Sequence, residues 1–163
     1  IAFFCGRLKD NGVMKKRLAG YRDALAEFGV ELREELVFEG DIDYKDGIAS
    51  ANRLLDTRTK ATAVVAAADI LAIGAKKAFY ERGVRVPEDI SLMGFDDLEI
   101  SQYLTPGLST VRQQISTKGE KAVELLIRNI EEPELTKQEL ILPVTLVERG
   151  SVLRRAAADN ART

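Results

Sequence analysis

The chain has 163 residues, 45% of them hydrophobic and 31% charged, so it is long enough to form one domain with a substantial core. Its 24 basic and 26 acidic residues give a net charge of −2, whereas nucleic-acid-binding modules usually carry a basic excess. The chain contains no histidine and a single cysteine. These counts exclude histidine-based catalytic triads and an intrachain disulfide, and they remove the commonest metal ligand.

The first six residues form a continuous apolar run, which predicts a strand covered on both faces. This run has neither the basic region nor the cleavage site of a signal peptide. Because the chain opens directly in this strand, we expect it to be part of a longer protein. The helical spacing of Leu18, Tyr21, Leu25 and Phe28 then predicts a helix that ends at Gly29.

Strands and helices continue to alternate along the following segments. Apolar runs predict the strands, and apolar residues at helical spacing predict the helices between them. The predicted elements are a strand over Glu35–Phe38, a helix over Tyr44–Thr57, a strand over Thr62–Ala68, a helix from Asp69 to Arg82 and a strand over Ile90–Phe95. This alternation predicts an α/β fold with a doubly wound parallel sheet between helices.

Acidic residues follow several of the predicted strands, namely Asp41, Asp69, Asp96 and Asp97. In a parallel sheet the carboxyl ends of the strands meet at one edge, and ligands bind there. Carboxylates accept hydrogen bonds from hydroxyl groups, so this pattern favours a polyhydroxyl ligand. Local roles remain open, because Asp69 also suits a helix N-cap and the other three suit turns.

The pattern changes after residue 105. Leu108–Arg112 predicts a short strand, and a final β segment, Gln138–Glu148, is interrupted by Pro143. Between them, Ser116–Ile130 predicts a helix with a single apolar stripe. The stripe consists of Val123, Leu126, Ile127 and Ile130. Residues 154–163 are small and polar, and we expect them to fray.

Common phosphate-binding motifs are missing from the sequence. The first strand is not followed by G-x-G-x-x-G, and no G-x-x-x-x-G-K-[ST] occurs. A phosphoaccepting receiver domain shares the alternation of strands and helices, but it needs an acidic pair after its first strand, which here ends in Phe4-Cys5-Gly6. We therefore expect a binding domain and not an enzyme, with no cofactor and no metal.

Five short motifs follow one another in order. They are Arg17-Leu18-Ala19-Gly20-Tyr21, the segment Ala68–Ala75, Pro87-Glu88-Asp89-Ile90-Ser91, Gly94-Phe95-Asp96-Asp97 and the segment Pro106–Gln113. With these motifs, residues 1–150 resemble the effector core of the lactose/galactose repressor family of bacterial transcription regulators. The resemblance implies a two-lobed, periplasmic-binding-protein-like core that closes around a small effector, a sugar or sugar derivative. It also implies a homodimer that binds operator DNA through a separate N-terminal headpiece.

The resemblance implies effector contacts at four positions, Arg17, Asp69, Asp96 and Gln113. Arg17 suits paired hydroxyl groups because a guanidinium donates several hydrogen bonds in one plane. The alternative interpretation of Arg17 is a solvated charge on a helix. The alternative interpretation of Gln113 is an ordinary strand residue.

The sequence departs from the family pattern near this site. Ala68 replaces an asparagine that often precedes the aspartate at the position of Asp69, so a polar contact is lost. Where the family often has an aromatic residue that stacks on a sugar, this chain has Ile42, and Tyr44 is the candidate substitute.

Dimer contacts are implied at Ile73, Tyr80, Tyr103 and Leu104, with ordinary core packing as the alternative for two of them. The implied boundaries are a second lobe over residues 1–107, a crossover strand and helix of a missing first lobe over 108–137, strands that return to the second lobe over 138–153, and the tail over 154–163. The helix Ser116–Ile130 would then lack its lobe, and burying its stripe is worth roughly 6–12 kcal/mol. We expect it to pack on another copy of the chain, to fold back onto this lobe or to be poorly ordered.

A periplasmic sugar-binding protein of a transporter shares this fold and is the alternative function. The regulator interpretation places the protein in the cytoplasm without a membrane partner, whereas the alternative requires export.

Overall fold

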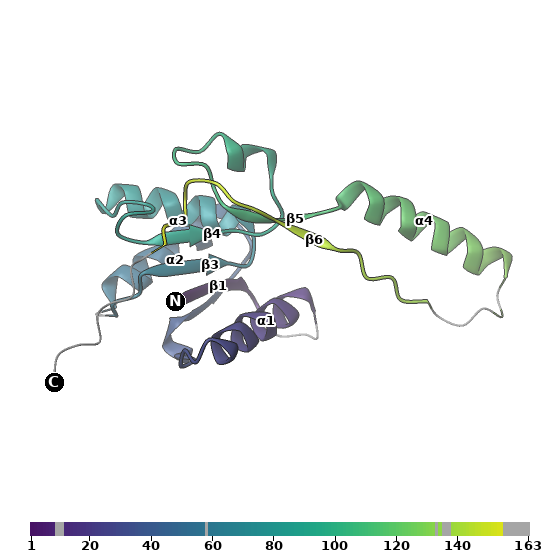
Figure 1. Ribbon diagram of the computed structural model, residues 1–163, viewed down its shortest axis with the longest axis horizontal. Helices are drawn as coiled ribbons and strands as arrows, with labels where there is room; N and C mark the ends of the chain where they lie inside the picture. The colour runs from purple at the N-terminus through teal and green to yellow at the C-terminus, as the bar shows by residue number, and fades with distance from the viewer. Residues whose placement is uncertain (9–11, 58, 133, 135–137, 155–163) are drawn as a thin grey trace.

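The computed structural model describes residues 1–8, 12–57, 59–132, 134 and 138–154. Its centre is a four-stranded parallel sheet in the order β2-β1-β3-β4. The strands are β1 (Ala2–Gly6), β2 (Val37–Gly40), β3 (Ala63–Ala66) and β4 (Ser91–Met93) (Figure 1). The helices that connect them are α1 (Val13–Glu27), α2 (Tyr44–Asp56) and α3 (Asp69–Glu81).

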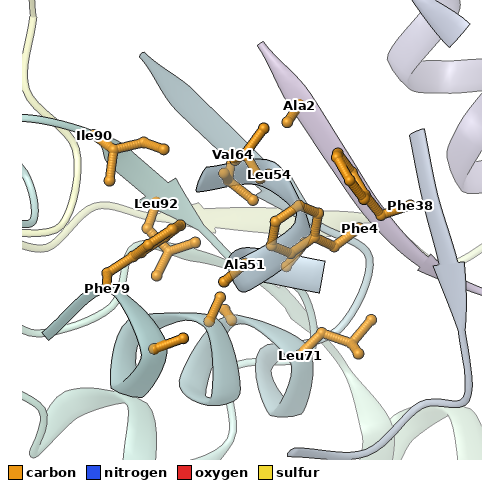
Figure 2. Close-up of a cluster of buried hydrophobic side chains, with 14 of the residues drawn as sticks. Ala2, Phe4, Phe38, Ala51, Leu54, Val64, Leu71, Phe79, Ile90 and Leu92 are labelled. Carbon is orange, nitrogen blue, oxygen red and sulfur yellow. The ribbon is translucent and has the colours of Figure 1, made fainter. Parts of the chain in front are cut away.

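Adjacent side chains of β1 point to opposite faces of the sheet and belong to two separate cores. Phe4 packs with residues of α2 and α3 in the larger core, which Figure 2 shows. Phe3 packs with Leu18 and Tyr21 of α1 in the smaller core, where the rings of Phe3 and Tyr21 stack with centroids 4.8 Å apart. Helices therefore cover both faces, and the predicted doubly wound α/β sheet is confirmed.

Two details near the predicted elements differ from expectation. Glu34–Leu36 forms a 3-10 turn, so the strand predicted at Glu35–Phe38 begins only at Val37. Phe28, predicted on the apolar stripe of α1, lies at the C-cap of that helix and is 80% exposed. The helix ends at Glu27, and Gly29 follows Phe28 with a φ of 65°.

Two further strands leave the sheet beside β4. β5 (Thr110–Gln113) pairs antiparallel with β6 (Val144–Val147), and a bridge between Met93 and Ser109 joins the start of β5 to the edge of the sheet. β6 begins directly after Pro143, so the β segment predicted over Gln138–Glu148 forms a strand only in its second half. Proline has no backbone N–H to donate to a ladder, which explains why the strand starts there.

α4 (Ile115–Glu131) extends from β5 away from the sheet (Figure 1). None of its residues is buried, and the four side chains of its apolar stripe are between 50% and 68% exposed. The prediction that this helix is covered by folding back onto the lobe is therefore wrong for the single chain, because β5 and β6 carry it away from the sheet. Packing against another copy stays a prediction.

No helix in the described ranges is long and apolar enough to cross a membrane. The tail predicted to fray, residues 154–163, lies outside the described residues except for Arg154, which is exposed.

Candidate functional site

Three side chains meet at the carboxyl edge of the sheet, and we call them the polar rim: Arg17 of α1, Asp96 of the loop after β4, and Gln113 of β5. Nη2 of Arg17 lies 3.3 Å from Oδ1 of Asp96, and Nε2 of Gln113 donates to the same oxygen at 2.6 Å. The structure thus brings together three of the four predicted contact residues. Their binding of an effector stays a prediction.

Arg17 is held in place from several sides. Its Nη1 donates to the carbonyl oxygen of Ala67, and its guanidinium lies over the ring of Phe95, 3.7 Å from the centroid. Burial lowers the pKa of Arg17, and the carboxylate of Asp96 opposes that shift, so the side chain stays charged at neutral pH. A guanidinium that is already fixed loses little entropy when it donates to a ligand.

Asp69 lies beneath the polar rim and has no exposed surface. Its carboxylate accepts hydrogen bonds from the backbone N of Leu98 at 2.8 Å, from Oγ of Ser101 at 2.6 Å and from Oγ1 of Thr110 at 2.5 Å. Ala68 occupies the N-cap of α3, so the capping alternative for Asp69 is wrong. The carboxylate anchors the loop after β4 and the start of β5, and it offers no surface for the effector contact predicted for it.

The backbone is left-handed at Asp96 and Asp97, with φ values of 116° and 53°. This conformation is unfavourable for residues with a side chain, although aspartate tolerates it better than most. It separates the two carboxylates. Asp96 joins the polar rim, while Asp97 accepts from Nε of Arg112 at 2.6 Å and from Nη2 of Arg149 at 2.7 Å.

The pKa of Asp97 reflects this environment. Burial of the carboxyl would raise its pKa, but the hydrogen bonds and charges of Arg112 and Arg149 outweigh burial and lower the pKa below its usual value. The carboxyl group of Asp97 is therefore ionised in the folded protein at neutral pH. It ties the loop that carries Asp96 to β5 and to the segment after β6.

An apolar groove of about 790 Å³ adjoins the polar rim. Its lining includes Arg17, Phe95 and Gln113 together with a larger apolar set. The apolar set comprises Ile1, Phe3, Val13, Tyr21, Leu25, Phe28, Val30 and Val65. The side chains of Arg17, Gln113, Lys16 and Lys118 give the groove groups that bind hydroxyls, and the first two also belong to the rim.

The residues after β2 lie apart from the rim contacts. Asp41 pairs on the surface with Nε of Arg7 at 2.7 Å. Ile42 and Tyr44 are both about half exposed, so Tyr44 keeps its place as the candidate stacking residue. Within the described ranges, no group of three or more Cys, Asp or Glu residues is placed to hold a metal ion.

The four predicted dimer residues divide into two pairs. Tyr80 and Tyr103 are 84% and 69% exposed, whereas Ile73 and Leu104 are half-buried. Leu104 packs against the larger core, as the core alternative expects. The exposed tyrosines remain predicted dimer contacts.

Sequence reasoning missed the residues that hold the site together. Phe95 supports Arg17, Ser101 and Thr110 bind Asp69, and Arg149 binds Asp97. Polar residues such as Ser101 and Thr110 next to apolar runs were the available signal, since a buried hydroxyl needs a partner. The partners themselves lie far away in sequence.

Comparison with known proteins decides the family. The model of the periplasmic binding protein-like domain matches residues 1–152. The chain belongs to the periplasmic binding protein-like domain family. The match confirms the fold expected from the five motifs.

The similar proteins include transcription regulators. The chain is 37% identical over 152 residues to the ribose operon repressor of Haemophilus influenzae, covering 93% of this chain and 46% of the repressor. It is 39% identical over 149 residues to the HTH-type transcriptional regulator MalR of Clostridium butyricum, covering 91% of this chain and 44% of that protein. The solved complex of the transcriptional regulator CelR with cellobiose matches with a TM-score of 0.87 at 33% identity, covering 92% of this chain and 46% of CelR.

The chain therefore spans about half the length of the curated relatives it matches. Solved structures described as LacI-family regulators also match, which confirms the predicted likeness to the lactose/galactose repressor family. These relatives are regulators and not enzymes, in agreement with the prediction for this chain.

Proposed function

We propose that this chain is the effector-binding and dimerisation part of a sugar-responsive transcription regulator. The observation that carries the proposal is the polar rim, in which Arg17, Asp96 and Gln113 meet at the edge of a periplasmic binding protein-like sheet. Relatives of this chain are regulators, and one of them is solved with cellobiose. A rim of one guanidinium, one carboxylate and one amide suits a ligand with several hydroxyl groups.

The rim residues have distinct roles in this proposal. Asp96 accepts hydrogen bonds from effector hydroxyls, Arg17 donates to neighbouring hydroxyl oxygens, and Gln113 fixes the orientation of Asp96. Asp69 holds the loop beneath them. Because Gln113 lies on β5, which leads into α4, a ligand on the rim acts directly on the segment that leaves the lobe.

The remaining functions belong to the whole protein. Operator DNA is bound by a separate headpiece, since this chain has a net charge of −2. The protein acts in the cytoplasm as a homodimer, with Tyr80 and Tyr103 in the interface. Residues 1–107 with 138–153 form one lobe, and residues 108–137 contribute to the other. A transporter's periplasmic sugar-binding protein is disfavoured, because the matching relatives are transcription regulators.

Titration calorimetry of the full-length protein with aldopentoses, aldohexoses and disaccharides tests the effector role. We expect one sugar class to bind, and Asp96→Asn and Arg17→Gln to weaken that binding by about tenfold or more, since each removes a charge-assisted hydrogen bond. Asparagine and aspartate are among the residues that adopt a positive φ most often, so we expect the first variant to fold. Arg22→Gln is the matched control, because Arg22 lies on the same helix in an exposed pair with Glu34.

Unchanged affinity in both rim variants would reject the assignment of the rim. A protein that binds sugars but no DNA in the presence or absence of sugar would support the transporter alternative.

A further inference from the structure

A second hollow adjoins the polar rim. It has a volume of about 380 Å³, and its lining joins α1, β5, the start of α4 and the segment before β6. Three of its lining side chains are lysines, Lys16, Lys118 and Lys121, and we call it the lysine hollow. Gln113, Lys16 and Lys118 line both this hollow and the apolar groove that contains Arg17, so the two spaces are contiguous.

The charges in the lysine hollow are unbalanced. Lys121 pairs with Glu124 at 2.7 Å, but Lys16 and Lys118 form no ion pair with any residue in the described ranges. Glu139 is the one carboxylate in the lining as described. Asp96, the carboxylate of the polar rim, is already engaged by Arg17 and Gln113.

Neither unpaired lysine is explained by helix stability. Lys16 lies in the first turn of α1 and Lys118 in the first turn of α4, and neither first turn contains an acidic residue. A cation in the first turn of a helix is unfavourable, because the helix dipole places positive charge there. An anion bound between the two lysines would remove this repulsion.

We propose that the effector is a hydroxylated molecule with an anionic group, which Lys16 and Lys118 bind while the polar rim binds the hydroxyls. This inference rests on the proposed effector function and names the chemical class of the effector. Phosphate and carboxylate share the required chemistry, since both accept charge-assisted hydrogen bonds from ammonium groups. A neutral sugar leaves both ammonium groups unpaired.

The test compares matched ligands on the full-length protein by titration calorimetry at low ionic strength. The probes are a neutral aldopentose and aldohexose, their terminal phosphate esters, the corresponding aldonic acids, and inorganic phosphate alone. We expect an ester or an acid to bind at least about tenfold more tightly than its neutral parent. The better of the two identifies the source of the charge.

Variants assign that preference to the lysines. Lys118→Met keeps most of the side-chain volume, and we expect it to reduce the preference for the anionic ligand to less than about threefold without weakening the neutral parent. Lys15→Met is the matched control, since Lys15 is exposed on α1 and lines neither hollow. Equal thermal unfolding of the variants establishes that both fold.

The outcomes separate this inference from the proposed function. Sugar binding with no preference for charge, or a preference that survives Lys118→Met, overturns the anionic effector and leaves the polar rim intact. Binding of inorganic phosphate alone that Lys118→Met abolishes supports the lysine hollow, even if no sugar binds and the rim is rejected. If none of these probes binds, the anionic effector is overturned, and if the disaccharides of the first experiment do not bind either, the proposed function is overturned with it.

Discussion

At the scale of single residues, the site depends on buried carboxylates whose charges are fully engaged. Asp69 accepts three hydrogen bonds without any exposed surface, and Asp97 lies between two arginines. Removing a partner from such a carboxylate is more harmful than removing a surface charge, because the remaining group stays buried without compensation. Both carboxylates hold the loop that presents Asp96.

Gly94 is required by its distance from Asp69. A Cβ atom at residue 94 would lie 2.1 Å from Oδ1 of Asp69 and 3.0 Å from Cδ2 of Leu108. We expect Gly94→Ala to lower the free energy of unfolding by about 2–4 kcal/mol, because the buried carboxylate must move away from its donors. Urea unfolding followed by circular dichroism measures this. Gly20→Ala is the control, since nothing lies within 4 Å of a Cβ there and helix propensity favours alanine.

Asp97 links stability to pH. Its pKa is lowered in the folded state, so its contribution to stability is present above the unfolded value of about 3.9 and is lost as the pH falls through the folded value. We expect Asp97→Asn to cost about 1.5–3 kcal/mol at pH 7. The difference between variant and parent should shrink below about pH 4, where protonation removes the same charge. A difference that stays constant down to pH 3 would show that the arginine pairs do not stabilise the fold.

At the scale of elements, local patterns predicted what local physics determines. The apolar run of β1 and the helical spacing of Leu18, Tyr21 and Leu25 sufficed for their elements, because burial of these side chains drives both. The starting points of β2 and β6 did not follow from the apolar pattern. A 3-10 turn delays the start of β2, and β6 begins only after Pro143.

The candidate site was likewise predicted only in part from the sequence. Convergence of Arg17 with Asp96 followed from the strand-end rule and the family motifs, and the structure places them in contact. The burial of Asp69 did not follow, because its partners Ser101 and Thr110 are 32 and 41 positions away and only the folded chain brings them together.

The start of α2 offers a test at this scale. The carboxylate of Asp43 accepts a hydrogen bond from the backbone N of Asp46 at 2.8 Å and so caps the helix. We expect Asp43→Ala to lower the free energy of unfolding by about 1 kcal/mol. Chemical denaturation of Asp23→Ala, an exposed position inside α1, should show a change within about 0.5 kcal/mol. An equally small effect at Asp43 would mean that solvent replaces the cap.

At the scale of the whole molecule, α4 decides how the chain behaves in solution. Its stripe of Val123, Leu126, Ile127 and Ile130 stands exposed on a helix that touches little of the sheet (Figure 1). Pairing two such stripes, whose eight side chains are about half exposed, would stabilise the dimer by roughly 6–12 kcal/mol, against an association cost of about 4–15 kcal/mol. The two ranges overlap, so the balance corresponds to weak association.

We accordingly expect the 163-residue chain to self-associate at concentrations of about 100 µM, as measured by sedimentation velocity. Leu126→Glu with Ile130→Glu should return it to a monomer, because each substitution places a charge in the contact. Arg128→Glu places a carboxylate on α4 at a position that is neither three nor four residues from any member of the stripe, and it should leave association unchanged. If the parent chain is monomeric, or if the double variant and the control associate equally, the stripe is not the contact. Tyr80 and Tyr103 then become the surface to test by substitution with lysine.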